Sequence, residues 1–207
     1  MKTQWMKIIG AIILSLIMIV MTACGSDTST ATQQVKEFRD YIEVQDEAGL
    51  FENAIAEEDT YWTEAQAEDV VQMLKNDEDE NSEMMGIMAA QGQHYDATSE
   101  KNKEYDLYDD VTKVGPFYID EVEDEFVLRV RSYDVTIVTE PNAVVTFLDE
   151  EYTADEDGEI EVGKIGPGFY ELEGALETED GEEETATDNF FMFEYEDFSP
   201  TVYLEFE

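Results

Sequence analysis

Apolar residues recur at two different spacings along the chain, and the change between these spacings divides the sequence. From Val35 to about Gly92 they recur every three or four residues, as Val35, Phe38 and Ile42 do, which is typical of helices that bury one face. From Val111 onward they alternate with polar residues, which is typical of strands that bury one face. Helices followed by strands predict an α+β chain.

The first part of the chain carries the pattern of four helices. Asp46 is expected to cap the second helix, and residues 63–66 have the capping-box form that opens a third. Residues 76–80 interrupt the pattern, so the fourth helix is expected to begin at Asn81 or Ser82. Its methionines suit either a core or a groove that accepts a partner, and core packing is the preferred interpretation.

Turn residues divide the second part of the chain into short strands. The clearest strand is predicted for residues 133–139, and Glu140-Pro141-Asn142 closes it. Asp157-Gly158 and Asp180-Gly181 are dipeptides typical of hairpin turns. Several short strands at this spacing predict a small antiparallel β-sandwich. Residues 94–110 are polar and rich in tyrosine, and no element is assigned to them.

These patterns predict two small domains behind a tether. We expect a helical domain over residues 35–113 and a β-sandwich domain over residues 114–207. Residues 24–34 are rich in small polar side chains and show no apolar period, so they are expected to form a flexible tether. Hydrophobic residues make up 43% of the chain and aromatic residues 12%, which is enough to build folded cores.

The N-terminal residues 1–23 have the layout of a signal peptide. Lys2 and Lys7 precede the apolar run 8–21, which is shorter than the roughly 20 residues of a membrane span and suits a signal-peptide core of about 7–15. Small residues flank Cys24, which is the single cysteine of the chain. This layout resembles the lipobox of bacterial lipoproteins, although Met21 stands where leucine is usual.

The lipobox resemblance implies that Cys24 carries a lipid and becomes the first residue of the mature chain. The alternative is an uncleaved anchor helix, extended by Trp5 and Met6. Both alternatives place the folded body outside the cytoplasm. The expected location is therefore the outer face of a bacterial cell membrane, with the lipid as the contact to the membrane.

The charge of the chain is strongly negative. There are 53 acidic residues against 11 basic ones, the formal net charge is −42, and no lysine or arginine follows Lys164. Nucleic acid is not expected as a partner, because phosphate binding requires a basic surface. The acidic surface is either a general solvated surface or a specific face for cations or polycations, and the first interpretation is preferred.

No motif in the sequence predicts a catalytic, metal or cofactor site. Thr153 and Lys164 stand at the first and twelfth positions of a faint calcium-loop pattern, where aspartate and glutamate would be needed, so an ordinary turn is favoured. His94 has no second histidine and no nearby cysteine to complete a zinc site. The glycines of residues 163–168 lack the spacing of a phosphate-binding loop.

Two segments of the sequence together resemble a known family. The first is WTEAQAEDVVQMLK at residues 62–75, and the second runs from YDVTIVT at residues 133–139 to IGPGFYEL at residues 165–172. Their order is similar to the extracytoplasmic second and third domains of the TcaA/YvbJ family of Gram-positive envelope proteins. Here the zinc ribbon and membrane helix with which family members begin are missing, and Cys24 takes the place of the helix as anchor.

The resemblance implies an envelope location, a non-enzymatic body and a link to cell-wall stress or to the response to glycopeptide antibiotics. The leading hypothesis is a surface lipoprotein that acts as an interaction or spacer module, with cell-wall or envelope proteins as partners. An extracytoplasmic binding protein for cations or cationic ligands is the alternative, and a hydrolase with buried carboxylates is a third. No catalytic residue is assigned.

Overall fold

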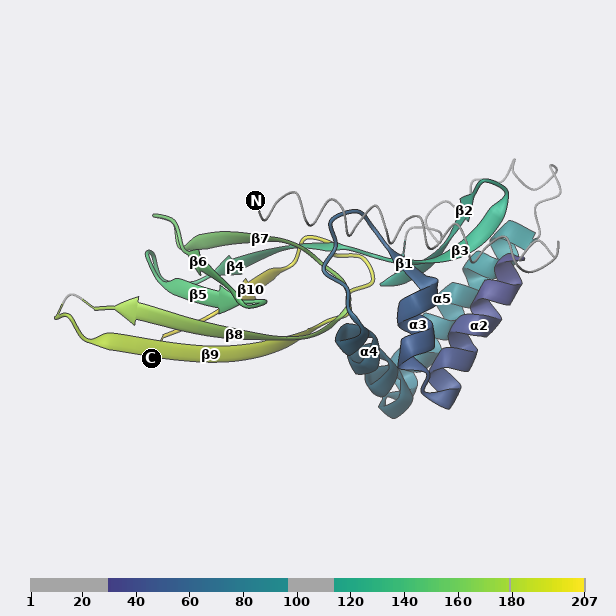
Figure 1. Cartoon of the computed structure of the whole chain (residues 1–207), viewed down its shortest axis with the longest axis horizontal. Helices are drawn as coiled ribbons and strands as arrows, with labels where there is room; N and C mark the ends of the chain where they lie inside the picture. The colour runs from purple at the N-terminus through teal and green to yellow at the C-terminus, as the bar shows by residue number, and fades with distance from the viewer. Residues whose placement is uncertain (1–29, 97–113, 179, 207) are drawn as a thin grey trace, which may run out of the picture.

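The computed structural model of the chain describes residues 30–96, 114–178 and 180–206 (Figure 1). Helices come first and strands follow, so the predicted α+β class is confirmed. The helices are α2 (Ala31–Val44), α3 (Glu47–Asn53), α4 (Glu64–Asn76) and α5 (Glu78–Asp96). The strands are β1 (Ala54–Ala56), β2 (Phe117–Val122), β3 (Glu125–Val130), β4 (Tyr133–Val138), β5 (Val144–Phe147), β6 (Glu150–Thr153), β7 (Glu159–Ile165), β8 (Gly168–Glu177), β9 (Glu183–Met192) and β10 (Thr201–Tyr203).

Helix α2 begins inside the stretch that the sequence assigned to the tether. The Thr30 hydroxyl accepts a hydrogen bond from the Gln33 amide at 3.2 Å, which caps the helix. Ala31 is completely buried in the core. Residues 31–34 therefore belong to the folded body, and the expected tether boundary at residue 34 is wrong.

Contacts of nearby side chains mark where the other helices begin. Asp46 caps α3 as predicted, through a bond from the Gly49 amide to its carboxylate at 3.0 Å. Thr63 precedes α4 as predicted, but its hydroxyl donates to the side chain of Gln66 and caps no backbone amide. Helix α5 begins earlier than predicted, because the carboxylate of Asp77 accepts from the amides of residues 79 and 80, both at 3.1 Å.

The first hydrophobic core contains the helices and a late β-hairpin. Strand β1 pairs in parallel with β3, and β2 pairs antiparallel with β3 in the same sheet. The buried methionines Met84 and Met88 confirm the core interpretation of the α5 methionines. Strands β2 and β3 contribute four fully packed residues to the same cluster, namely Phe117, Ile119, Leu128 and Val130.

We call residues 30–96 and 114–131 the helical unit and residues 132–206 the β-sandwich unit. Along the chain, Val130 is the last fully buried residue of the first hydrophobic core and Tyr133 is the first of the second core. The boundary between the units therefore lies later than the one expected between residues 113 and 114. The reason is that the β2–β3 hairpin buries its apolar side chains against the helices. The alternation that predicted strands after Val111 does not indicate which core those strands join.

The second core lies between two sheets. One sheet has the order β10-β4-β7 and the other β6-β5-β8-β9. An antiparallel sandwich was expected, but strand β10 pairs in parallel with β4, so this part of the prediction is wrong. Asp180-Gly181 lies in the β8–β9 hairpin as predicted, whereas the turn at Asp157-Gly158 connects β6 to β7 in the opposite sheet. The hairpin prediction for Asp157-Gly158 is therefore wrong.

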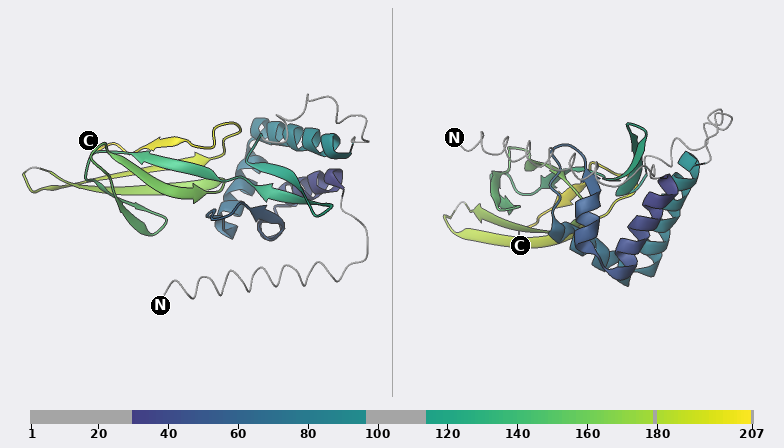
Figure 2. Two further views of the ribbon diagram at one scale, coloured as in Figure 1. Left: turned by 90° about the horizontal axis from the view of Figure 1, so that it is seen from above. Right: turned by 45° about the vertical axis from the view of Figure 1, so that its right-hand side comes forward.

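The molecule is elongated, with the helical unit at one end and the β-sandwich unit at the other (Figures 1 and 2). Helix α2 lies at one end of the long axis of the molecule, and the β8–β9 hairpin lies at the opposite end. Within residues 30–96, 114–178 and 180–206, no helix has the length and apolar character needed to cross a membrane.

Candidate functional site

The site residue predicted from the sequence, Cys24, lies outside the described residues. Its lipidation therefore stays a prediction. The first residues after it in the sequence that the structure describes are Thr30 and the first turn of α2, at the end of the molecule opposite the β8–β9 hairpin.

The faint calcium loop forms a backbone turn. The Asp155 carboxylate accepts hydrogen bonds from the amides of Asp157 and Glu159, both at 2.9 Å, so it stabilises the turn itself. Gly158 has a φ of +81°, and a Cβ there would lie 2.2 Å from the Thr139 carbonyl oxygen, so glycine is required. In the part of the chain that the structure describes, no group of three or more His, Cys, Asp or Glu side chains could hold a metal ion.

His94 lies in the last turn of α5 and is half-buried. Its ring meets that of Tyr95 edge to face, with the centroids 5.4 Å apart. This contact gives the histidine a packing role at the end of the helix.

Polar side chains from three segments converge where the two units meet. The Glu57 carboxylate follows β1 and accepts from the Tyr118 hydroxyl at 2.9 Å, from the Ser132 amide at 3.2 Å and from the Ser132 hydroxyl. Arg131 pairs with the same carboxylate at 3.5 Å. We call these residues, together with Phe198, the junction cluster.

Aromatic rings hold the arginine of the junction cluster. The Arg131 guanidinium carbon lies 4.2 Å from the ring centroid of Tyr118 and 4.7 Å from that of Phe198. Such cation–π contacts strengthen as water is removed, and the Arg131 side chain is only 15% exposed. Tyr118 belongs to the helical unit and Phe198 to the β-sandwich unit, so the arginine links the two.

The junction cluster shifts the acidity of its members. Burial alone raises the pKa of the Glu57 carboxyl, but hydrogen bonds from Ser132 and Tyr118 and the charge of Arg131 outweigh it, so this pKa lies below its usual value. Burial and the hydrogen bond to Glu57 raise the pKa of Tyr118 to about 12. Glu57 is thus a charged acceptor surrounded by donors, which suits a structural connection better than proton transfer.

Further contacts fix the orientation of the two units. The Tyr61 amide donates to the Lys164 carbonyl at 2.8 Å, and the Gly166 amide donates to the Tyr61 carbonyl at 2.9 Å. The Tyr195 hydroxyl donates to the Glu80 carboxylate at 2.9 Å. Backbone and side-chain bonds of this kind hold the sandwich as an extension of the helical unit.

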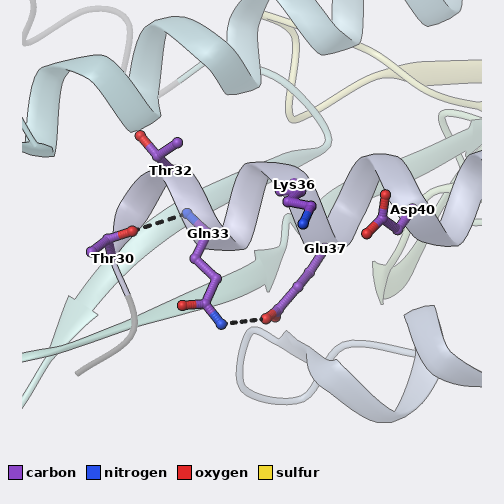
Figure 3. A pocket seen from close by; sticks show the side chains of 6 residues that line it. All are labelled: Thr30, Thr32, Gln33, Lys36, Glu37 and Asp40. Carbon is purple, nitrogen blue, oxygen red and sulfur yellow. Dashed lines mark hydrogen bonds between the residues drawn. The ribbon is translucent and has the colours of Figure 1, made fainter. Parts of the chain in front are cut away.

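The surface of α2 carries a shallow hollow of about 560 Å³ (Figure 3). Its lining residues lie on the exposed side of this one helix and its cap, and Gln33 donates to Glu37 at 2.8 Å within it. Because one helix cannot enclose a ligand, this hollow offers little for specific binding.

The outer face of the four-stranded sheet carries two adjoining hollows. The larger, of about 460 Å³, is lined by residues of α4, β5, β8 and the β5–β6 turn. The smaller, of about 270 Å³, is lined by residues of β8 and β9. Glu171 and Glu173 line both hollows. We call their combined surface the outer-face groove, which comprises Gln66, Thr146, Leu148, Asp149, Phe169, Tyr170, Glu171, Leu172, Glu173, Thr187, Asp188 and Asn189.

The sequence did not single out the junction cluster or the outer-face groove. Glu57 is one acidic residue among 53, and nothing local distinguishes it. Phe169 follows Gly166-Pro167-Gly168 in the sequence and is exposed in the structure. An aromatic residue at an outward-facing strand position was the one signal in the sequence that could have indicated the groove. Neither a protein-family model nor a curated protein matches the chain, so the resemblance to envelope proteins remains an expectation.

Proposed function

We propose that the chain is a lipoprotein of a bacterial cell envelope, anchored through Cys24, whose folded body is a non-enzymatic interaction or spacer module. The observation that carries the proposal is the order of its N-terminal features. A short basic head and an apolar run precede Cys24, and the buried residue Ala31 begins the fold soon afterwards.

The dimensions of the chain support a spacer role. Residues 25–30 at full extension reach at most about 20 Å, so a lipid on Cys24 keeps the start of α2 close to the membrane. The β8–β9 hairpin lies at the opposite end of the elongated molecule (Figure 2). The contacts of the junction cluster favour a fixed orientation between the two units, so on this proposal the β-sandwich unit forms the end of the module farthest from the anchor.

The resemblance to the TcaA/YvbJ family adds a physiological expectation. On this proposal the module takes part in the response to cell-wall stress or to glycopeptide antibiotics, through contacts with cell-wall or envelope proteins. Its strong negative charge favours basic partners over anionic ones.

Metabolic labelling with a fatty acid tests the anchor. Cys24→Ala is expected to abolish labelling and to leave an unprocessed precursor, because the thiol is the attachment atom. Ser26→Ala is the matched control two residues away and should label like the wild type, and Met21→Leu should label at least as well. Equal labelling of the Cys24→Ala variant would refute the lipoprotein proposal.

A further inference from the structure

The outer-face groove combines exposed aromatic rings with unpaired acidic groups. Phe169 on β8 faces Phe191 on β9 as its cross-strand partner. Phe169 and Phe191 are 40% and 36% exposed, so they form a pair of neighbouring apolar side chains at the surface. They provide an apolar platform at the end of the groove nearest to α4.

The structure holds this platform in place. The Asp69 carboxylate on α4 accepts a hydrogen bond from the Phe169 amide at 3.1 Å. A Cβ at Gly168 would lie 2.6 Å from the Gln66 side chain, so the glycine allows α4 to approach β8 closely. Gln66 is only 7% exposed and lines the groove, and its amide oxygen accepts a hydrogen bond from the Thr63 hydroxyl. This contact fixes the Gln66 side chain beside Phe169.

The acidic groups of the groove have no cation of their own. Glu171, Glu173 and Asp149 are exposed, and the described residues contain no salt bridge to any of them. Lys164 is the last basic residue of the chain and lies on β7 in the opposite sheet. The groove is therefore complementary to a basic partner.

The spacing of these groups defines the partner further. Phe169, Glu171 and Glu173 lie on the same face of one strand, about 7 Å from one to the next. The described part of the chain contains no group of three or more His, Cys, Asp or Glu side chains that could hold a metal ion. An extended peptide repeats its side chains at the same interval, so alternate residues can face Phe169, Glu171 and Glu173 in turn.

We infer that the outer-face groove binds an extended basic peptide segment in which one apolar residue is followed, at every second position, by lysine or arginine. The apolar side chain packs on Phe169 and Phe191, and the two basic side chains pair with Glu171 and Glu173. The inference does not depend on the lipid anchor, because these residues lie on β8 and β9 of the β-sandwich unit, whereas Cys24 precedes α2 in the chain.

Fluorescence anisotropy with the full chain in a non-ionic detergent tests the inference. The probe is a labelled Lys-Ser-Lys-Ser-Leu-Ser-Lys-Ser-Lys peptide, which presents the pattern in either direction. Exposed ion pairs contribute modestly, so the double variant Glu171→Gln/Glu173→Gln is expected to weaken binding at least threefold at about 0.15 M salt. The matched control Glu159→Gln/Glu161→Gln removes the same charge at the same spacing from β7 and should leave binding unchanged.

A second pair of measurements isolates the apolar platform. Phe169→Ala should weaken binding of the leucine peptide and leave binding of a version with serine in place of leucine unchanged. Circular dichroism should confirm that each variant is folded. The inference is overturned if both glutamate double variants weaken binding equally, if the serine peptide binds the wild type as tightly as the leucine peptide, or if the probe does not bind.

Discussion

The helical unit and the β-sandwich unit reach a buried core in different ways. In the helical unit, side chains from α2 and α5 pack against a hairpin that follows much later in the chain. In the β-sandwich unit, nearly all core residues come from the continuous stretch after Tyr133. The helical unit is therefore closed by a hairpin from outside the helical segment, whereas the β-sandwich unit closes within one continuous stretch, in which distant strands such as β4 and β10 pair.

A buried side chain makes this closure specific. Gln91 on α5 is completely buried, and its amide oxygen accepts from the Ile119 amide of β2 at 3.0 Å. Its amide nitrogen donates to the Val114 carbonyl at 3.2 Å. The first bond satisfies the backbone amide of a fully buried residue, and the second ties Val114 to the helix, so α5 and the hairpin support each other.

The largest expected effect comes from cutting the chain at the two candidate boundaries. A fragment of residues 30–114 loses Phe117, Ile119, Leu128 and Val130, each at most 2% exposed, and is expected not to fold cooperatively. Burial of each such side chain contributes about 1.5–3 kcal/mol, so the loss approaches a typical total stability of about 5–15 kcal/mol. A fragment of residues 30–131 keeps the core and should fold.

Trp62 is the single tryptophan of each fragment. In the longer fragment its ring can pack edge to face on Phe117, as it does in the full chain with the centroids 5.9 Å apart. Urea titrations followed by tryptophan fluorescence should give a sigmoidal transition for residues 30–131 and a gradual one for residues 30–114. A cooperative transition in the shorter fragment would show that the helices suffice without the hairpin.

Glu57→Gln should produce the next largest effect, because it weakens the connection between the units. The change keeps the shape of the side chain but removes its charge, and a hydrogen bond to a charged group typically contributes about 1.5–3 kcal/mol. Since Glu57 is 28% exposed, we expect a loss at neutral pH nearer the lower value. Urea unfolding of the full chain measures it, and the exposed neighbour variant Glu58→Gln is the control.

The loss should depend on pH in a defined direction. The pKa of Glu57 is lower in the folded chain than its ordinary value of 4.5, so the folded state favours the ionised form. Its contribution is fully present above pH 4.5 and disappears as the pH falls through the folded pKa. The stability difference between wild type and Glu57→Gln should therefore shrink below pH 4.5, and a difference that stays constant to pH 3 would contradict this account.

Sequence patterns predicted the helices well and the boundary between the cores badly. Local chemistry decides where helices begin, so Asp46 could be recognised as a cap before α3. The early start of α5 was missed because Asp77, which caps it, lies among several other acids that interrupt the apolar pattern. Alternating residues indicated that residues 117–130 form strands, but only the tertiary packing assigns those strands to the helical unit.

The junction cluster and the outer-face groove could not be predicted for a related reason. Glu57 and Phe198 are far apart in sequence, and no local motif reports that Arg131 lies between Tyr118 and Phe198. With acidic residues throughout the chain, the pattern does not distinguish a carboxylate that holds an arginine from one that faces water.

Salt should produce the smallest effect, and it sharpens the contrast in charge between the units. The helical unit carries several basic residues, among them Lys36, Lys75 and Arg129, whereas the β-sandwich unit carries Lys164 alone. Repulsion between carboxylates opposes the compact state and is screened as the Debye length falls from about 10 Å at 0.1 M salt to about 3 Å at 1 M.

Sodium chloride is therefore expected to raise the melting temperature of the full chain smoothly, and by more than it raises that of the fragment 30–131. A gain of 1 kcal/mol corresponds to about 2–4 °C for a chain of this size, so calorimetry can resolve the difference. Calcium chloride at equal ionic strength is the control, because a cation that binds only the folded state adds RT ln(1 + [L]/Kd) and saturates. A saturable calcium shift that survives 1 M sodium chloride would contradict the screening account and would favour a dedicated cation site on the acidic surface.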